Sequence, residues 1–379
     1  MDNKKIEIRP IQHTKPELKK YVKFGIDMYR DNPCYVPPLI SDEVNTLLPD
    51  HNPAFDFCEA QAFMAYRGEE PVGRITAIIN RNVNEKTGEN VLRFGFVDFI
   101  NDPAVVDALF AAASEWGRSR GMTRMIGPMG FSDLDHEAML IHGFDELGTM
   151  ATIYNYPYYP GHMERMGFVK DADWVEYRIK IPEAIPEKYS RVADIVQRRF
   201  NLKVKKYTSR KKIKEEYGLA IFDLINEAYA DLYGYSALTP RQISYYIDMY
   251  LGILRLDNVC LITDADDKLI CVGISMPSMS RALQKSNGRL FPTGWWHLLK
   301  GLTGKNDVVD LLLVAVKPEY QNKGVNALLF NNLIPTYNAN GYKEAESNLE
   351  LEGNENVQRQ WEAFERRLHR RRRVWTKDI

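Results

Sequence analysis

The stretch VVDLLLVAVKPEYQNKGVNALLF, residues 308–330, decides the fold of this chain. Its first nine residues form an almost continuous apolar run, which is typical of a buried strand when turn residues follow it. Pro318 and Gly324 then interrupt the chain before a second apolar stretch, so the sequence predicts a strand, a loop and a helix. The first amides of a helix have no partner within the helix and lie at the positive end of its dipole. We therefore expect this loop to bind a phosphate group, with Gly324 allowing close approach because it lacks a Cβ atom.

The same order of elements occurs twice along the chain. The matching segments are two strand–helix units at residues 5–31 and 202–234, two β-hairpins at 63–79 and 259–277, and two further strand–helix units at 91–122 and 308–342. Strands, hairpins and helices in this order predict an α+β fold with a mixed sheet in each copy. The prolines of the stretch IPEAIPEKY mark the junction. The sequence thus predicts two tandem domains, residues 1–182 and 183–379.

The overall charge is close to zero, because 50 lysines and arginines face 51 aspartates and glutamates. Such a balance makes a nucleic acid or an anionic membrane an unexpected partner for the chain as a whole. The first residues contain no apolar stretch of signal-peptide length, and no stretch reaches the ~18 apolar residues of a membrane span. We expect a cytoplasmic protein without stable membrane insertion. The four cysteines lack the spacing of a zinc or redox motif, so we expect free thiols and no metal.

The chain from the second hairpin to the stretch NENVQRQWEAFERRL resembles the GNAT acyltransferase superfamily. In that family a strand ending in Val-x-Pro leads to a pyrophosphate loop with the pattern Gln/Arg-x-x-Gly-x-Gly/Ala. Val316, Pro318, Gln321 and Gly324 match this pattern position by position, whereas Asn326 stands where the family has glycine or alanine. The resemblance implies an α+β chain of two tandem GNAT-like domains.

The resemblance also implies that the second copy binds acetyl-CoA or another acyl-CoA as a co-substrate. In the family, loop amides hold the pyrophosphate and the strand backbone holds the pantetheine arm. Carried over by position, the CoA-binding residues are Leu313, Val314, Ala315, Val316, Gln321, Asn322, Lys323, Gly324, Val325, Asn326 and Asn354. The first copy has no glycine between Phe99 and Leu109, where the loop would lie. We therefore expect a degenerate first copy that has lost CoA binding.

Transfer of an acyl group from a thioester to an amine needs a group that accepts the amine's proton and a proton for the leaving thiolate. The stretch KEAESNLELEGN, residues 343–354, alternates polar and apolar side chains, and Glu352 near its end is our candidate base. A solvated edge face is the alternative interpretation of these carboxylates. The resemblance implies a tyrosine acid in the helix after Asn354, but Trp361 stands there and indole has no titratable proton. Tyr337 or a water molecule is the expected proton donor instead.

Three further segments carry clustered polar or aromatic residues. Residues 133–146, DLDHEAMLIHGFDE, hold acids and two histidines whose spacing matches no metal-binding motif, so we expect a polar loop. Residues 366–373, RRLHRRRR, are interpreted either as a charged edge strand or as a binding surface for RNA or the 3′-phosphate of CoA. Residues 287–307, NGRLFPTGWWHLLKGLTGKND, are expected to pack against the neighbouring domain, to line a long acyl chain or to dock on a membrane surface.

These features together predict an acyl-CoA-dependent N-acyltransferase that works through its second copy. The acyl group would pass, in the simplest case as acetyl, to an amine of a small molecule or a peptide. A non-catalytic protein that binds acyl-CoA on the same scaffold is one alternative, and an RNA-binding protein is another. The near-neutral charge counts against RNA.

Overall fold

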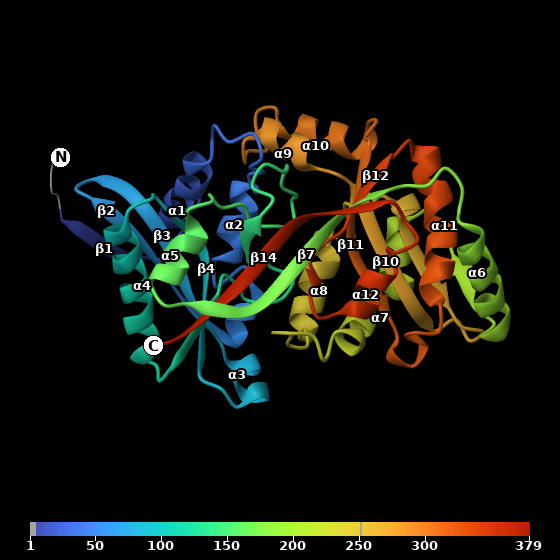
Figure 1. The fold of residues 1–379 in the computed structure, drawn as a ribbon, viewed down its shortest axis with the longest axis horizontal. Coiled ribbons are helices and arrows are strands. Elements are labelled where there is room, and N and C mark those ends of the chain that lie inside the picture. The colour runs from blue at the N-terminus through green and yellow to red at the C-terminus, as the bar shows by residue number, and fades with distance from the viewer. Residues whose placement is uncertain (1–4, 251) are drawn as a thin grey trace. The chain divides into compact units, whose positions relative to one another are not determined.

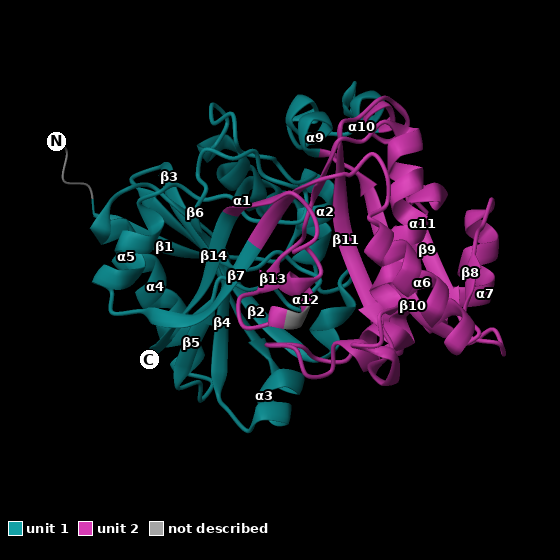
Figure 2. Cartoon of the chain, turned by 45° about the vertical axis from the view of Figure 1, so that its right-hand side comes forward, with its two compact units in different colours: residues 1–175, 280–298, 370–379 teal, residues 176–279, 299–369 magenta. Residues whose placement is uncertain are grey.

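The computed structural model describes residues 5–250 and 252–379 and contains two compact units (Figures 1 and 2). Unit 1 comprises residues 1–175, 280–298 and 370–379, and unit 2 comprises residues 176–279 and 299–369. Both units are discontinuous along the chain. Strands β7 (Val169–Lys180) and β14 (Arg366–Asp378) each begin in one unit and end in the other, and residues 280–298 of unit 1 interrupt unit 2. The domain boundary predicted after residue 182 marks the point at which the order of elements begins again along the sequence. It stays a prediction.

Unit 1 is built on a mixed sheet with the strand order β1-β2-β3-β4-β5-β14-β7, and β6 also pairs with β14. Its strands, besides parts of β7 and β14, are β1 (Ile6–Ile11), β2 (Cys58–Arg67), β3 (Glu70–Asn80), β4 (Val91–Phe99), β5 (Arg124–Gly127) and β6 (Met139–His142). Its helices are α1 (Lys15–Met28), α2 (Ile40–Thr46), the 3-10 helix η1 (Pro53–Asp56), α3 (Arg81–Thr87), α4 (Pro103–Arg118), α5 (Tyr159–Arg165) and α9 (Ser280–Ser286). The first four strands pair antiparallel in chain order, and β4 and β5 are parallel.

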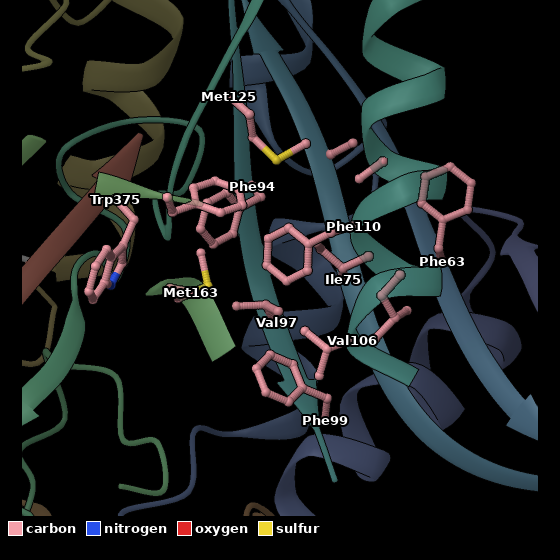
Figure 3. Close-up of a cluster of buried hydrophobic side chains, with 14 of the residues drawn as sticks. Phe63, Ile75, Phe94, Val97, Phe99, Val106, Phe110, Met125, Met163 and Trp375 are labelled. Carbon is pink, nitrogen blue, oxygen red and sulfur yellow. The ribbon is translucent and has the colours of Figure 1, made fainter. Parts of the chain in front are cut away.

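The core of unit 1 lies between α4 and the strands beside it (Figure 3). Phe94 of β4 and Phe110 of α4 meet edge to face, with ring centroids 5.0 Å apart. Val106 lies one helical turn before Phe110, so both side chains project from the same face of α4 onto the sheet. Trp375, near the end of the chain, belongs to the same buried cluster, so the last strand completes the core of unit 1.

Unit 2 repeats this plan with the strand order β7-β12-β11-β10-β9-β8. Its strands are β8 (Lys203–Lys205), β9 (Val259–Thr263), β10 (Leu269–Pro277), β11 (Val308–Val316), β12 (Glu344–Glu346) and β13 (Glu350–Leu351), with parts of β7 and β14. Its helical segments are α6 (Glu187–Arg199), α7 (Arg210–Ala228), α8 (Pro240–Tyr250), η2 (Leu256–Asn258), η3 (Pro318–Tyr320), α11 (Val325–Asn340), α12 (Glu355–Arg359) and the end of α10 (Gly294–Thr303). Strands β11 and β12 are parallel, as β4 and β5 are in unit 1.

Helix α11 packs closely on the sheet of unit 2 because β10 carries a glycine beneath it. A Cβ atom on Gly273 would lie only 2.6 Å from Cδ1 of Leu329. The helix ends at Gly341, whose φ of 83° is the left-handed conformation that glycine adopts at helix C-termini. The strand, loop and helix predicted for residues 308–330 are therefore present, and the prediction of an α+β fold with a mixed sheet is confirmed. Among the described residues, no helix is both long and apolar enough to cross a membrane.

The interpretation of the arginine run as an exposed edge strand is wrong. In unit 1, β14 lies between β5 and β7 in the strand order, so it is an interior strand. Arg370 is fully buried, Arg372 is 1% exposed, and a guanidinium nitrogen of Arg370 donates to the carbonyl oxygen of Leu147 over 2.6 Å. Arg373 pairs with Asp173 through two hydrogen bonds of 2.7 and 2.9 Å. Most of this basic run therefore satisfies buried acceptors instead of forming a solvated surface.

Candidate functional site

The loop between β11 and α11 presents an uncapped helix N-terminus. Asn322 and Gly324 both adopt left-handed backbone conformations, with φ of 58° and 84°, and the helix begins at Val325. No side chain caps this helix. Gln321 ties the loop to the preceding strand, since its side-chain amide donates to the carbonyl of Val316 over 3.0 Å. The amides of the first helical turn are thus positioned to bind an anion.

In unit 1 the corresponding helix is α4, and its N-terminus is capped by an acidic side chain. Asp102 precedes α4, and its carboxylate accepts a 2.8 Å hydrogen bond from the N–H of Ala104. The same carboxylate forms an ion pair with Arg67. A negative group therefore already occupies the position that an anionic ligand would take. This difference between the two helix starts agrees with the expectation that the first copy lacks a phosphate loop.

The structure shows a reason for a glycine at position 324 besides the one expected from sequence, which stays a prediction. Its positive φ favours glycine, and an added Cβ would lie 2.9 Å from Cγ1 of Val192 and 3.2 Å from Cγ2 of Val196. Both valines belong to α6, which packs beside α11 (Figure 1). The missing Cβ therefore allows close packing between the loop and α6, a requirement that a phosphate group need not impose.

Strand β11 contains a bulge and then separates from β12. On β10, Ile274 pairs with Leu313 and the next residue, Ser275, pairs with Leu311, so Leu312 is the extra residue of a bulge. The parallel pairing with β12 ends at Asp310, which lies opposite Glu346. Beyond that point, residues 313–316 keep their pairing with β10 alone. Over residues 313–316, just before the phosphate-type loop begins, the edge of β11 on the side of β12 is therefore no longer paired with β12.

An apolar cavity of about 50 Å³ lies in unit 2 between α11 and the sheet. Its lining comprises Ile179, Lys180, Ile181, Pro182, Gly273, Ile274, Ser275, Leu311, Val314, Leu329, Phe330, Leu333, Ile334, Tyr337, Ala345, Trp361 and Phe364. This volume holds only a few water-sized groups, so a long acyl chain would need the surrounding side chains to move.

Tyr337 lies in the wall of this cavity and is buried. Its hydroxyl donates to Oγ of Ser275 over 2.8 Å, and Ser275 in turn donates to the carbonyl of Asn258 over 2.9 Å. Burial raises the pKa of the Tyr337 phenol above its ordinary value, so it stays neutral at physiological pH. The hydroxyl thus forms a hydrogen bond to Ser275 between α11 and the sheet. The role of Tyr337 as a proton donor stays a prediction.

Trp361, which stands where the resemblance implies a tyrosine, is buried and pairs with an acid. Its indole N–H donates to Oε1 of Glu350 over 2.6 Å. Burial raises the pKa of Glu350 to about 7, while the hydrogen bond from Trp361 opposes this rise. Glu350 is therefore not part of a solvated edge face, and a carboxyl with this pKa can hold or release a proton near neutral pH.

A second buried polar group lies at the point where β11 and β12 separate. The carboxylate of Glu346 is 2.7 Å from Nε2 of His369, and its other oxygen accepts a 2.5 Å hydrogen bond from Arg178. With Glu176, these residues place one imidazole and two carboxylates within 4.8 Å of one another, all at most 2% exposed. Ala345 lines the apolar cavity, so Glu346 projects from the opposite face of the sheet. Arg178 supplies a positive charge to Glu346 within this buried group.

Sequence reasoning missed this group for an identifiable reason. His369 was hidden inside the arginine run RRLHRRRR, where its neighbours drew attention to charge. Glu346 is one of several alternating carboxylates within residues 343–354, and no neighbouring residue in the sequence marks its partner. The two residues come from different strands, β14 and β12, and no local pattern connects them.

Three more of the predicted site residues, Asn354, Glu352 and Asn326, take part in hydrogen bonds within unit 2. Asn354 begins α12, and its side chain accepts a 3.4 Å hydrogen bond from the N–H of Val357. Glu352 is half-buried, and its backbone carbonyl accepts from the side-chain amide of Gln358 over 2.8 Å. Asn326 donates from its side chain to Oε1 of Gln360 over 3.2 Å. Their roles in catalysis and CoA binding stay predictions.

The acidic segment of residues 133–146 lies in unit 1 and is only in part the polar loop that we expected, since residues 139–142 form β6. Glu137 is buried, whereas His136, His142 and Asp145 are exposed. Burial raises the pKa of Asp133 to about 7 and that of Glu137 to about 8. In the part of the chain that the structure describes, this segment brings no three potential metal ligands within reach of one another. The four cysteines are free, and three of them are buried.

Comparison with known proteins identifies two curated relatives that are similar over most of their length, while no protein-family model matches the chain. Protein YghO of Escherichia coli (strain K12) is 28% identical over 309 residues, which cover 81% of this chain and 78% of that protein. Bacterial ceramide synthase of Caulobacter vibrioides (strain NA1000 / CB15N) is 28% identical over 330 residues, which cover 84% of this chain and 82% of that protein.

Solved structures with this architecture are far more distant in sequence. A tandem GNAT protein from the clavulanic acid biosynthesis pathway superposes with a TM-score of 0.56 at 14% identity, covering 99% of this chain and 98% of that one. A conserved protein of Enterococcus faecalis V583, described as a probable N-acyltransferase, reaches a TM-score of 0.51 at 9% identity, covering 99% and 73%. At these identities the likeness concerns the fold alone.

Proposed function

This chain has the tandem GNAT fold, and on that premise we propose that it is an acyl-CoA-dependent N-acyltransferase whose unit 2 binds the acyl donor. The observation that carries the proposal is the uncapped start of α11 at Val325, placed directly after the stretch of β11 that has left β12. A phosphate group at the helix start and an extended pantetheine arm along the free strand edge would use both features at once.

The donor would be held mainly by backbone groups. The first amides of α11 would receive the pyrophosphate of CoA, and backbone groups of residues 313–316 would bind the amides of pantetheine. Two of these carbonyls already accept side-chain hydrogen bonds, Val314 from Tyr229 over 2.9 Å and Val316 from Gln321 over 3.0 Å, so the arm would have to use the other groups or displace these bonds. Lys323 is exposed in the same loop and adds a positive charge close to the helix start. Unit 1, whose equivalent helix is capped by Asp102, would then bind no CoA and would serve the acceptor side or the scaffold.

His369 is the group we assign to accept the amine's proton. In the reaction the amine nitrogen bonds to the thioester carbon, the amine loses a proton, and the carbon–sulfur bond breaks to release CoA thiolate, which takes up a proton. The carboxylate of Glu346, 2.7 Å from Nε2 of His369, would stabilise the imidazolium that forms. Arg178 donates a 2.5 Å hydrogen bond to the other oxygen of that carboxylate and so fixes its position beside the imidazole. Glu352 remains the alternative base.

The name of one curated relative supports a long-chain acceptor as the substrate class that we propose. One relative is named a bacterial ceramide synthase, and a ceramide is the amide of a fatty acid with a long-chain amino alcohol. We extend this class to the present chain: a fatty acyl-CoA as donor and a long-chain amino alcohol as acceptor. Acetyl transfer to a small amine or a peptide is the competing possibility.

The test combines ligand-induced stabilisation with turnover. A donor at 100 times its dissociation constant should stabilise the folded state by about 2.7 kcal/mol, which a thermal melt resolves. Acetyl-, octanoyl- and palmitoyl-CoA are compared in melts, and thiol release is then followed with ethanolamine or a long-chain amino alcohol as acceptor. We expect the largest shift with palmitoyl-CoA and thiol release only with the long-chain acceptor.

Two variants separate donor binding from proton transfer. Lys323→Glu should weaken acyl-CoA binding roughly tenfold, because it reverses an exposed charge beside the phosphate loop, whereas Lys323→Gln should have a smaller effect. His369→Gln should lower thiol release by about 100-fold while leaving the acyl-CoA melting shift intact. His162→Gln, a buried histidine of unit 1, is the matched control.

Three outcomes would count against the proposal. No melting shift with any acyl-CoA would remove donor binding, and a shift without thiol release would favour the non-catalytic alternative. Full activity of His369→Gln would reject its assignment as base. The RNA-binding alternative loses its physical basis here, because Arg370 and Arg372, which would carry it, are buried.

A further inference from the structure

The segment between β10 and β11 concentrates positive charge. From Ser280 to Asn306 the chain has no aspartate or glutamate, although the protein as a whole has a net charge of −1. The same segment holds five cations, all exposed: Arg281, Lys285, Arg289, Lys300 and Lys305. We infer that α10 and the turn before it form a docking surface for an anionic lipid membrane.

Large apolar side chains project from the same segment. Phe291 is 77% exposed, Trp295 and Trp296 are each 49% exposed, and Leu299 is 50% exposed. Gly294 is the only buried residue of α10. Four large apolar side chains that are each about half exposed or more, within nine residues of the chain, are unusual on a protein surface unless something binds to them. Tryptophan beside lysine and arginine is typical of helices that lie in a membrane interface.

The ring of Trp295 is suited to an interface because its polar atom is already satisfied. Its indole N–H donates to the carbonyl of Pro292 over 3.0 Å. Inserting this ring among lipid headgroups and acyl chains would therefore leave no unpaired donor. The burial of apolar ring surface would then contribute to binding without a compensating loss of a hydrogen bond.

The residues that precede the docking surface are attached to the rest of unit 1 by hydrogen bonds. In unit 1, Oγ of Ser280 donates to the carbonyl of Gly148 over 2.8 Å, and the side-chain amide of Gln284 donates to the carbonyl of Pro33 over 2.8 Å. The N–H of Ile40 donates to the carbonyl of Gly288 over 2.9 Å. Helix α9 and the turn after it are thus held by hydrogen bonds, so the exposed apolar residues that follow belong to a built element of the fold.

Charge complementarity selects an anionic lipid surface as the occupant. Each lysine or arginine near such a surface strengthens binding roughly fivefold, and the segment contains five of them and no aspartate or glutamate in its sequence. A neutral membrane would use only the apolar residues, and a second copy of this chain would bring its own positive segment and repel the first. The inference is independent of the proposed acyl transfer, because docking needs neither donor nor acceptor.

The test measures vesicle binding by the full-length protein in the absence of acyl-CoA. Co-sedimentation compares vesicles of phosphatidylcholine with vesicles of equal parts phosphatidylcholine and phosphatidylglycerol, while tryptophan emission reports insertion. We expect binding to the anionic vesicles with a blue shift, weakened by salt, and at least tenfold weaker binding to the neutral vesicles.

Paired variants assign the binding to α10 and its flanks. Replacing Trp295 and Trp296 together by serine should reduce binding at least tenfold, whereas the equally exposed pair Ile195→Ser and Leu219→Ser should not. Arg289→Gln with Lys305→Gln should reduce binding about 25-fold, from roughly fivefold for each cation. Lys188→Gln with Lys343→Gln, two exposed lysines outside the segment, is the matched control.

Several results would overturn the inference. They are an absence of binding to anionic vesicles, equal binding to neutral ones, and binding that the tryptophan variant retains in full. Sedimentation velocity provides the remaining check. A native oligomer that the tryptophan variant converts to a monomer would make a second copy of the chain, not a membrane, the occupant of this surface.

Discussion

Replacing Glu350 by glutamine should stabilise unit 2 at alkaline pH and leave it unchanged at acid pH. Glu350 is 8% exposed, and its carboxylate accepts the 2.6 Å hydrogen bond from Trp361. Burial raises its pKa from the ordinary 4.5 to about 7 in the folded protein. Glutamine keeps an oxygen that accepts the indole N–H but carries no charge, so it removes only the cost of ionising a buried group.

The sign and size of the effect follow from the two pKa values. Because the folded protein holds this proton more tightly than the unfolded chain does, its contribution to stability is fully present below pH 4.5 and is lost as the pH rises to about 7. At about 1.4 kcal/mol for each tenfold difference in proton affinity, ionisation costs about 3 kcal/mol above pH 7. Glu350→Gln should therefore be about 3 kcal/mol more stable than the native chain at pH 8 and equally stable at pH 4.5.

Thermal melts at the two pH values provide the measurement. A change of about 3 kcal/mol in a unit of this size corresponds to roughly 6–12 °C in melting temperature. Glu319→Gln is the control, since the Glu319 side chain is 57% exposed and pays no comparable desolvation cost. The reasoning is refuted if Glu350→Gln and the native chain change in parallel with pH, or if the control gains as much at pH 8.

Three further predictions concern single positions. Gly324→Ala should lower the free energy of unfolding of the ligand-free protein by at least about 1 kcal/mol, because alanine is strained at a φ of 84° and its Cβ would contact Val192; an unchanged thermal melt would contradict this. Asp102→Ala should destabilise unit 1 by about 1 kcal/mol in urea titrations through loss of the helix cap, without affecting acyl-CoA binding; weaker binding would mean that unit 1 takes part in donor recognition. Trp361→Phe should cost about 1–3 kcal/mol at pH 8 and less at pH 4.5, since a charged Glu350 loses its donor; an equal loss at both values would point to packing alone.

Local features of the sequence were sufficient to predict most of the fold. The apolar run of residues 308–316 became β11, and the helix predicted after Gly324 became α11. These predictions succeeded because strand formation, helix ends and turns depend on neighbouring residues. The pairs of hairpins and strand–helix units likewise revealed the internal repeat. The phosphate-type loop was located by the same local order, since it needs only a strand, a glycine and a helix start.

What the sequence by itself determined, then, is the order and type of elements, the repeat and the position of the candidate donor loop. Only the tertiary structure decided that β14 is an interior strand, that Arg370 and Arg372 are buried, and that His369 lies 2.7 Å from Glu346. It also showed that Gly324 packs against α6. Strand order and register are chosen by burial across segments far apart in the chain, and no periodicity within a segment encodes its partner. The proposed proton-transfer pair depends on that choice, which is why the sequence showed its two members without joining them.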